Sequence, residues 1–258
     1  MIRTVINNLI LASLALLLLT SSAPQHVTTI FVIGDSTAAN KDLSKGSPER
    51  GWGMALQCYF DEAFIRVDNH AVNGRSSKSF IDEGRWDRLL SLIRPGDYVI
   101  IQFGHNDEKP QPDRHTDPGS TFDDNLARFV SETREKGGIP VVMNAVVRRN
   151  FNADTLVDTH GLYIVAPRDV ASRMHCHFVD ANRITHDLEQ SLGVEGSKRL
   201  HMWYNPGEHP ALPRGRQDNT HYNVFGAHQV ARRLADALTI EIPMLKKYRK
   251  DDDPCKMP

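Results

Sequence analysis

The sequence alternates short apolar runs of strand length with amphipathic helical segments, and this alternation limits the possible folds more than any other feature. Residues 28–33 and 98–103 are nearly continuous β-branched or apolar runs, a pattern typical of parallel strands buried on both faces. Shorter strand-like runs cover residues 65–67, 139–147 and 177–179. Helical spacing of apolar side chains covers residues 51–64, 80–93, 121–136, 165–174, 181–192 and 225–240. We therefore predict an α/β fold in which helices cover both faces of a central parallel sheet.

Residues 24–258 are predicted to form one domain. They contain no internal repeat, low-complexity linker or break in composition. Residues 200–219 are rich in proline, glycine and histidine, and we expect them to be irregular. Ligands of open α/β sheets bind beyond the carboxyl ends of the strands. Reactive side chains that directly follow a strand are therefore the first candidates for a functional site.

The first 23 residues have the pattern of a signal peptide. Arg3 is the only charged residue before an apolar run at residues 9–19, and small residues 20–23 follow it. This pattern predicts cleavage near Ser22 or Ala23 and export to a periplasm or out of the cell. The run is shorter than the ~20 apolar residues that a transmembrane helix needs. An uncleaved N-terminal anchor is the alternative.

The charge balance and the cysteines exclude several classes of partner and cofactor. The formal net charge of −1 provides no bulk attraction to nucleic acid or to an anionic membrane. Cys58, Cys176 and Cys255 are an odd number and cannot all pair within one chain. They do not have the spacing of a zinc site, and the sequence lacks the glycine-rich phosphate-binding motifs. No metal or organic cofactor is predicted.

Ser36 is the candidate nucleophile because it follows the first strand in Gly34-Asp35-Ser36-Thr37. A nucleophilic serine needs a base, a carboxylate that orients the base, and fixed donors for the developing oxyanion. The serine does not lie in the G-x-S-x-G motif of common α/β-hydrolases. Taken alone, a serine in a turn is usually ordinary turn chemistry.

The remaining parts of such a site occur later in the sequence. Asp218 and His221, three residues apart, can act as orienting carboxylate and base, or Asp218 can simply cap the final helix. Gly74, in Asn73-Gly74-Arg75-Ser76, offers a backbone N–H that no side chain blocks. Asn106, in Gly104-His105-Asn106-Asp107 after the second long strand, offers a side-chain amide. Each motif is weak alone, but their order and their positions at strand ends reinforce one another.

These four motifs, in this order, resemble the SGNH hydrolase superfamily, which is named after its serine, glycine, asparagine and histidine. The resemblance runs from about residue 29 to residue 235. It implies that Ser36 is the nucleophile, His221 the base and Asp218 the residue that orients His221. It also implies an oxyanion hole made of the Ser36 N–H, the Gly74 N–H and the Asn106 amide.

A narrower resemblance is to the rhamnogalacturonan acetylesterases, which belong to that superfamily. It rests on residues 73–80, 84–86 and 95–107, on Arg148-Arg149-Asn150-Phe151, and on residues 218–223 followed by Gly226-Ala227. The resemblance implies a flavodoxin-like, three-layer α/β/α sandwich without a metal or organic cofactor. It also implies a secreted esterase that removes O-acetyl groups from a pectic polysaccharide.

Four residues are candidates for binding such a substrate. Pectic backbones carry galacturonate carboxylates, which arginine can pair with bidentately, and Arg75, Arg148 and Arg149 lie near strand ends. Salt bridges to neighbouring acidic residues are an equally good explanation for them. Trp203, followed by Tyr204, can stack on a sugar ring or can pack its own loop.

Two other functions remain open at this point. An esterase of the same fold can act on another acylated glycan, such as acetyl-xylan, whereas the lack of a strongly apolar lid segment after residue 24 disfavours a lipase. A non-catalytic carbohydrate-binding protein is the alternative from a different class, and the complete set of serine, glycine, asparagine, aspartate and histidine disfavours it. Oligomeric state is not predicted.

Overall fold

The computed structural model describes residues 27–250 of the 258-residue chain. The predicted signal peptide, residues 1–23, and Cys255 lie outside the described residues. Cys58 is disulfide-bonded, and Cys176 is a free thiol. No helix within residues 27–250 is long and apolar enough to cross a membrane.

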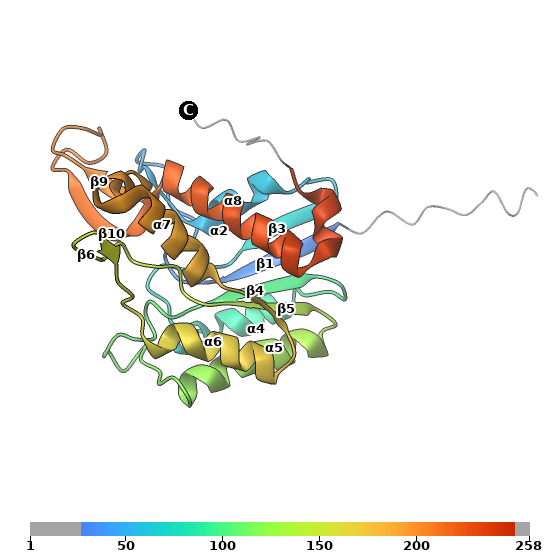
Figure 1. Ribbon diagram of the computed structural model, residues 1–258. Helices are drawn as coiled ribbons and strands as arrows, with labels where there is room; N and C mark the ends of the chain where they lie inside the picture. Colours follow the sequence, from blue (N-terminus) through green and yellow to red (C-terminus); the bar gives the residue numbers. More distant parts are fainter. Residues whose placement is uncertain (1–26, 251–258) are drawn as a thin grey trace, which may run out of the picture.

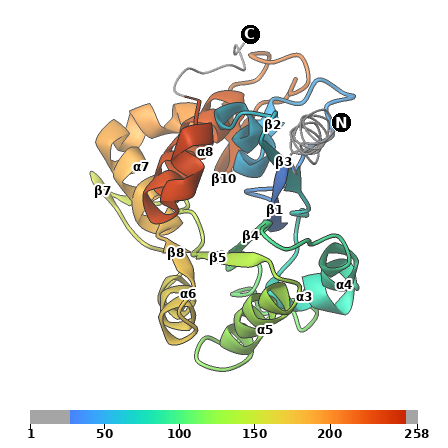
Figure 2. The same cartoon turned by 90° about the vertical axis from the view of Figure 1, so that its right-hand side faces the viewer.

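A parallel five-stranded sheet forms the centre of the protein, as predicted. Its strand order is β3-β1-β4-β5-β8, and every neighbouring pair is parallel. The strands are β1 (Thr28–Gly34), β3 (Ile65–Asn69), β4 (Tyr98–Gln102), β5 (Ile139–Met143) and β8 (His177–Val179). The sheet is the middle layer of a three-layer α/β/α sandwich (Figures 1 and 2).

Helices cover the two faces of the sheet in separate groups (Figure 2). One face carries α2 (Trp52–Ala55), η1 (Leu56–Tyr59), α7 (Ala181–Ser197) and α8 (Val224–Glu241). The other carries α3 (Ser77–Asp82), α4 (Arg85–Leu90), α5 (Thr121–Glu135) and α6 (Leu162–Arg173). The 3-10 helices η2 (Lys198–Leu200) and η3 (Pro243–Tyr248) flank α8.

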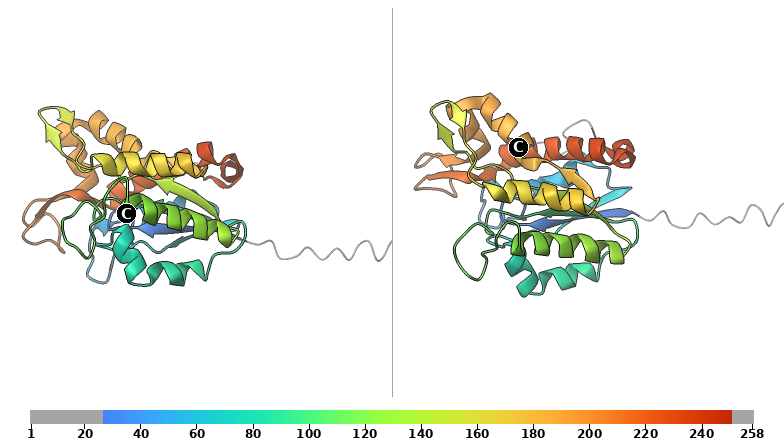
Figure 3. Two further views of the ribbon diagram at one scale, coloured as in Figure 1. Left: turned by 90° about the horizontal axis from the view of Figure 1, so that it is seen from below. Right: turned by 60° about the horizontal axis from the view of Figure 1, so that its bottom comes forward.

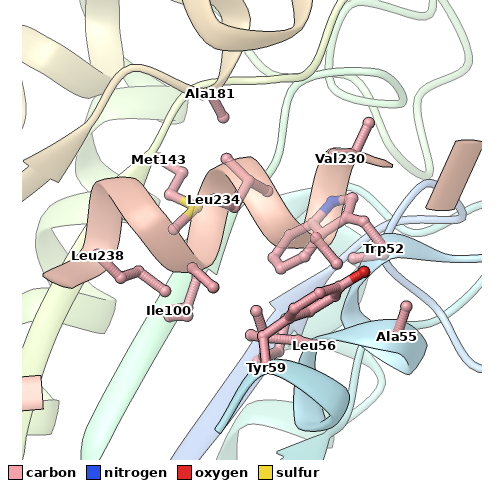
Figure 4. Close-up of a cluster of buried hydrophobic side chains, with 14 of the residues drawn as sticks. Trp52, Ala55, Leu56, Tyr59, Ile100, Met143, Ala181, Val230, Leu234 and Leu238 are labelled. Atoms are coloured by element: carbon pink, nitrogen blue, oxygen red, sulfur yellow. The ribbon is translucent and has the colours of Figure 1, made fainter. Parts of the chain in front are cut away.

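The strands bury side chains on both faces, which is why their sequences are continuously apolar. In β1, Ile30 and Val32 belong to the core under α8, whereas Phe31 and Ile33 belong to the core under α5. This division follows from the two-residue period of a strand. Figure 4 shows Leu234 and other side chains of α8 packed above the sheet, with Trp52 and Tyr59 beside them.

A second, antiparallel sheet contains both ends of the segment 200–219, so only residues 205–215 between its strands are irregular as predicted. Its order is β2-β10-β9, with β2 (Glu49–Arg50), β9 (His201–Tyr204) and β10 (Arg216–Asn223). Strands β9 and β10 lie beyond one end of the central sheet (Figures 1 and 3). The polar sequence of β10 lacks the apolar alternation from which a strand is predicted. A short hairpin of β6 (Phe151–Asn152) and β7 (Thr155–Leu156) was also not predicted.

Several helix and strand boundaries also differ from the predictions. The segment 80–93 forms two helices, because Gly84 adopts φ = 63° between α3 and α4. The segment 51–64 is helical only from Trp52 to Tyr59. The first four of these residues form α2, and the last four form the 3-10 helix η1. Strand β5 ends at Met143 instead of residue 147. Helix α7 continues past residue 192 across a kink at Gly193.

Candidate active site

Ser36 lies in a tight turn at the carboxyl end of β1. Gly34 ends that strand so close to β4 that a Cβ on it would lie 2.6 Å from the carbonyl oxygen of Gln102. The fully buried Asp35 then accepts hydrogen bonds from the backbone N–H and the hydroxyl of Thr37, at 2.9 and 2.8 Å. Asp35 therefore has a structural role in this turn. Its bonds leave the half-buried Ser36 free to point its hydroxyl outward.

His221 and Asp218 reach Ser36 from a bulged part of β10. The pairing of β10 with β9 shifts register between Asp218 and Tyr222, and a bulge of this kind re-aims side chains. The Nε2 atom of His221 lies 2.9 Å from Ser36 Oγ. Its Nδ1 atom lies 2.8 Å from Asp218 Oδ2. The three side chains therefore form a continuous hydrogen-bonded chain.

Asp218 is held in its charged form. Its Oδ1 accepts hydrogen bonds from the backbone N–H groups of Thr220 and His221, at 2.8 and 2.9 Å. Burial acts to raise the pKa of Asp218, but the side-chain and backbone bonds from His221 outweigh burial and hold the pKa well below its ordinary value. A charged carboxylate at this atom fixes the proton of His221 on Nδ1. Nε2 is then free to accept the serine proton.

Gly74 and Asn106 line the same pocket as Ser36 and carry amide N–H groups. Gly74 has φ = 75° with open space where a side chain would be, a conformation that favours glycine. The Asn106 amide donates to the carbonyl oxygen of Arg75 at 3.0 Å, and its Oδ1 accepts from Lys109 at 3.0 Å. Because an ammonium can only donate, Lys109 fixes which end of the amide is the oxygen. The second N–H of Asn106 is available to a ligand.

Asp107 ties the loops of Gly74 and Asn106 together. Its buried carboxylate accepts from the N–H and hydroxyl of Ser77, at 2.9 and 2.5 Å, and from the hydroxyl of Thr116 at 3.0 Å. Burial raises the pKa of Asp107 to about 6, against the lowering effect of the Ser77 bonds. The separation of the two donor groups is therefore set by a buried carboxylate.

A pocket of about 490 Å³ opens over these groups. It is lined by Ser36, Glu49, Asn73, Gly74, His105, Asn106, Lys109, Arg148, Thr220 and His221. Of these, Glu49, Asn73, His105, Lys109 and Thr220 were not predicted as site residues. Burial, together with His160 and Arg148, lowers the pKa of His105 well below its ordinary value. His105 therefore presents a neutral ring to the pocket.

Of the four predicted substrate-binding residues, one lines the pocket and three do not. Arg148 lines the pocket, where it forms an ion pair with Glu108. Arg75 does not line it, because its guanidinium binds Glu83 at 2.9 and 3.1 Å and the carbonyl oxygen of Asn73 at 3.0 Å. Arg75 thus forms a salt bridge to a neighbouring acidic residue, which was the alternative to substrate binding.

Arg149 and Trp203 lie behind the site instead of in the pocket. Arg149 is 7% exposed, and Trp203 packs 5.2 Å from its guanidinium. Both donate to Oδ1 of Asn219, at 3.1 and 2.8 Å, and the N–H of Arg149 donates to the Asn219 carbonyl at 2.8 Å. These bonds hold Asn219, which directly follows Asp218 in the loop that leads to His221. The predicted substrate contact of Arg149 and Trp203 is thus replaced by a contact to the acid–base loop.

The described part of the chain has no cluster of three or more His, Cys, Asp or Glu residues that could hold a metal ion. A serine hydroxyl in contact with an oriented imidazole, opposite two amide donors, can attack a carbonyl carbon and bind the resulting oxyanion.

Comparison with known proteins gives consistent matches. The family model of the GDSL-like lipase/acylhydrolase family matches residues 32–228. The rhamnogalacturonan acetylesterase RhgT of Bacillus subtilis (strain 168) is 40% identical over 210 residues, which are 81% of this chain and 88% of that protein.

Two solved structures share the fold. The Bacillus subtilis protein YxiM has a TM-score of 0.71 at 26% identity, over 85% of this chain and 58% of that chain. Axe2, an acetylxylan esterase from Geobacillus stearothermophilus, has a TM-score of 0.57 at 18% identity, over 83% of this chain and 95% of that chain. The likeness to Axe2 concerns the fold alone.

Proposed function

Since the chain belongs to the GDSL-like lipase/acylhydrolase family, we propose that it is a serine esterase that removes O-acetyl groups from a pectic polysaccharide, rhamnogalacturonan. The observation that carries the proposal is the chain of hydrogen bonds from Ser36 through His221 to Asp218, at 2.9 and 2.8 Å. It borders a pocket that also presents Gly74 and Asn106.

Acyl transfer follows from this geometry. His221 Nε2 takes the proton of Ser36 as Oγ attacks the acetyl carbonyl carbon. The oxyanion accepts hydrogen bonds from the N–H groups of Ser36 and Gly74 and from the Asn106 amide. The C–O bond to the sugar then breaks, and the sugar oxygen leaves with the proton from His221. Water attacks the acetyl-serine by the same route, which releases acetate and restores Ser36.

Two observations support a pectic substrate. RhgT, which is 40% identical to the chain, is described as a rhamnogalacturonan acetylesterase. Lys109 and Arg148 place two cations on the pocket wall, and burial followed by repulsion from Arg114 and Arg148 lowers the pKa of Lys109. Crowded cations of this kind suit the carboxylate of a galacturonate residue. Export of the enzyme rests on the signal-peptide pattern of residues 1–23.

Acetate release from two polymers tests the substrate. We expect wild type to release acetate from acetylated rhamnogalacturonan faster than from acetylated xylan, and Ser36→Ala to release none from either. Release from xylan alone would refute the pectic substrate and retain the esterase. No release from either polymer, with a small aryl acetate also untouched, would contradict the esterase and favour a carbohydrate-binding protein.

A further inference from the structure

A buried lysine contacts three parts of the candidate site at once. Lys41, whose side chain is 5% exposed, donates to the carbonyl oxygen of Ser36 and to Oδ1 of Asn73, both at 2.6 Å. It also lies 2.9 Å from Oε1 of Glu49. The three N–H groups of an ammonium are thereby all in use. Lys41 links the nucleophile turn, the loop before Gly74 and strand β2.

Glu49 and Arg216 continue this chain of charges to the acid–base loop. The second oxygen of Glu49, Oε2, lies 2.6 Å from Arg216 Nη1. Nη2 of Arg216 lies 2.5 Å from Asp218 Oδ2, the oxygen that binds His221. Glu49 and Arg216 stand on neighbouring strands, because β2 pairs with β10.

The contacts close into a ring that begins and ends at Ser36. One half runs from Ser36 through His221 to Asp218, and the other returns through Arg216, Glu49 and Lys41. Buried charges are costly unless they are paired and hydrogen-bonded, and each member of the ring has at least two partners. A ring with this connectivity restricts how far β10 can move relative to the nucleophile turn.

We propose that Lys41, Glu49 and Arg216 are positioning residues that hold Ser36 and the Asp218–His221 pair at their reacting distance and set the charge around His221. The inference rests on the proposed function, because it concerns the same catalytic set. Glu49 and Arg216 act on the imidazole with opposite signs. Arg216 Nη2 is 3.5 Å from His221 Nδ1 and opposes a protonated ring, whereas the carboxylate of Glu49 favours one.

Other charged and titratable groups share the environment of His221. They are Asp218 on β10, Asp35 and Lys41 after β1, His105 and Lys109 after β4, and Arg148 after β5. Each of these groups keeps its own charge when Glu49 or Arg216 is replaced. The difference between the Glu49 and Arg216 variants therefore reports on those two charges.

The test compares Glu49→Gln and Arg216→Gln, with Glu195→Gln and Arg183→Gln as controls from exposed ion pairs. NMR measures the titration of the His221 ring in each protein, with its signals assigned from a His221→Asn spectrum. We expect the midpoint to move to lower pH in Glu49→Gln and to higher pH in Arg216→Gln, each by about half to one pH unit. The controls should match wild type.

Kinetics on a small aryl acetate provide the second readout. We expect kcat to fall about tenfold or more in both variants, with KM within about twofold. The isosteric Glu49→Gln keeps the side-chain shape, so it remains informative if Arg216→Gln folds poorly. Midpoints that stay fixed or move in the same direction, or a kcat equal to that of the controls, would overturn the positioning role. The NMR result does not require activity, so it separates failure of this inference from failure of the proposed function.

Discussion

The imidazole Nε2 of His221 lies 2.9 Å from the hydroxyl of Ser36, although 185 residues separate them in the sequence. Ser36 is placed by the end of a central parallel strand, and His221 by a bulge in an antiparallel strand outside that sheet. The site therefore depends on how the small sheet docks against the sandwich.

Removing the Asn106 amide should slow the reaction and spare the fold. One oxyanion donor is worth about 3 kcal/mol, so Asn106→Ala should lower kcat on an aryl acetate about a hundredfold. Lys109→Met removes the partner of the Asn106 oxygen but keeps the Asn106 N–H donors, so it should lower kcat by a smaller factor. Steady-state kinetics and circular dichroism measure both variants. An unchanged kcat in Asn106→Ala would remove this residue from the oxyanion hole.

Gly74 and Gly46 both adopt a left-handed backbone conformation, so Gly46 is a matched control for Gly74. Both have positive φ, 75° and 67°, with nothing close to an added Cβ. Alanine should destabilise either position by a similar amount, about 1 kcal/mol. Only Gly74→Ala should also lower kcat, because Gly74 lines the pocket and a shift of its strained backbone would move the N–H proposed to bind the oxyanion. Thermal unfolding and kinetics compare them, and equal kcat values would contradict the assigned donor.

The pKa of Asp218 makes part of the stability dependent on pH. Because the folded pKa is depressed below the unfolded value, the carboxylate stabilises the protein above about pH 4. This contribution is lost as the pH falls further toward the folded value. The stability advantage of wild type over Asp218→Asn should thus be largest near neutral pH and shrink below about pH 4.

Denaturant unfolding at several pH values measures this difference, with the exposed Asp113→Asn as the control. If the stability advantage of wild type over Asp218→Asn grows below pH 4, the pKa of Asp218 is not lowered by folding. In the same Asp218→Asn variant, kcat should fall by a factor of up to about 10⁴, because the orienting carboxylate is lost.

Substitutions of the neighbouring residues Arg148 and Arg149 should affect different properties of the enzyme. Arg148→Met should raise KM for the charged polymer and leave kcat on an aryl acetate within about twofold, since Arg148 lies on the pocket wall. Arg149→Met should lower stability and kcat on every substrate, because it removes the guanidinium bond to the Asn219 side chain. If Arg148→Met affects neutral and charged glycans equally, Arg148 does not bind a carboxylate.

The parallel sheet was predicted from the sequence, and the structure joins the candidates Ser36, His221 and Asp218 by hydrogen bonds. Strands such as β1 and β4 are continuously apolar because both faces are buried, and Ser36 and Asn106 follow them directly. Asp218 and His221 were found by their spacing and resemblance, although the strand that carries them was not predicted. Strand β10 is polar along most of its length, and its pairing with β2 and β9 arises from contacts distant in sequence.

The supporting residues could not be predicted for the same reason. Lys41 and Glu49 lie in a segment without helical or strand periodicity, and their partners are set by the docking of β2 on β10. Arg149 and Trp203 were correctly placed near the site but on the wrong side of the acid–base loop. An arginine that binds a substrate and one that binds a loop have the same sequence pattern.

Covalent labelling tests the nucleophile most directly. The protein is treated with an aryl phosphonate ester, and intact-mass and peptide mass spectrometry locate the adduct. We expect one phosphonyl group on Ser36, formed quickly in wild type, much more slowly in His221→Gln, and not at all in Ser36→Ala. An adduct on another residue, or equal labelling of wild type and Ser36→Ala, would contradict the assignment of Ser36 as the nucleophile.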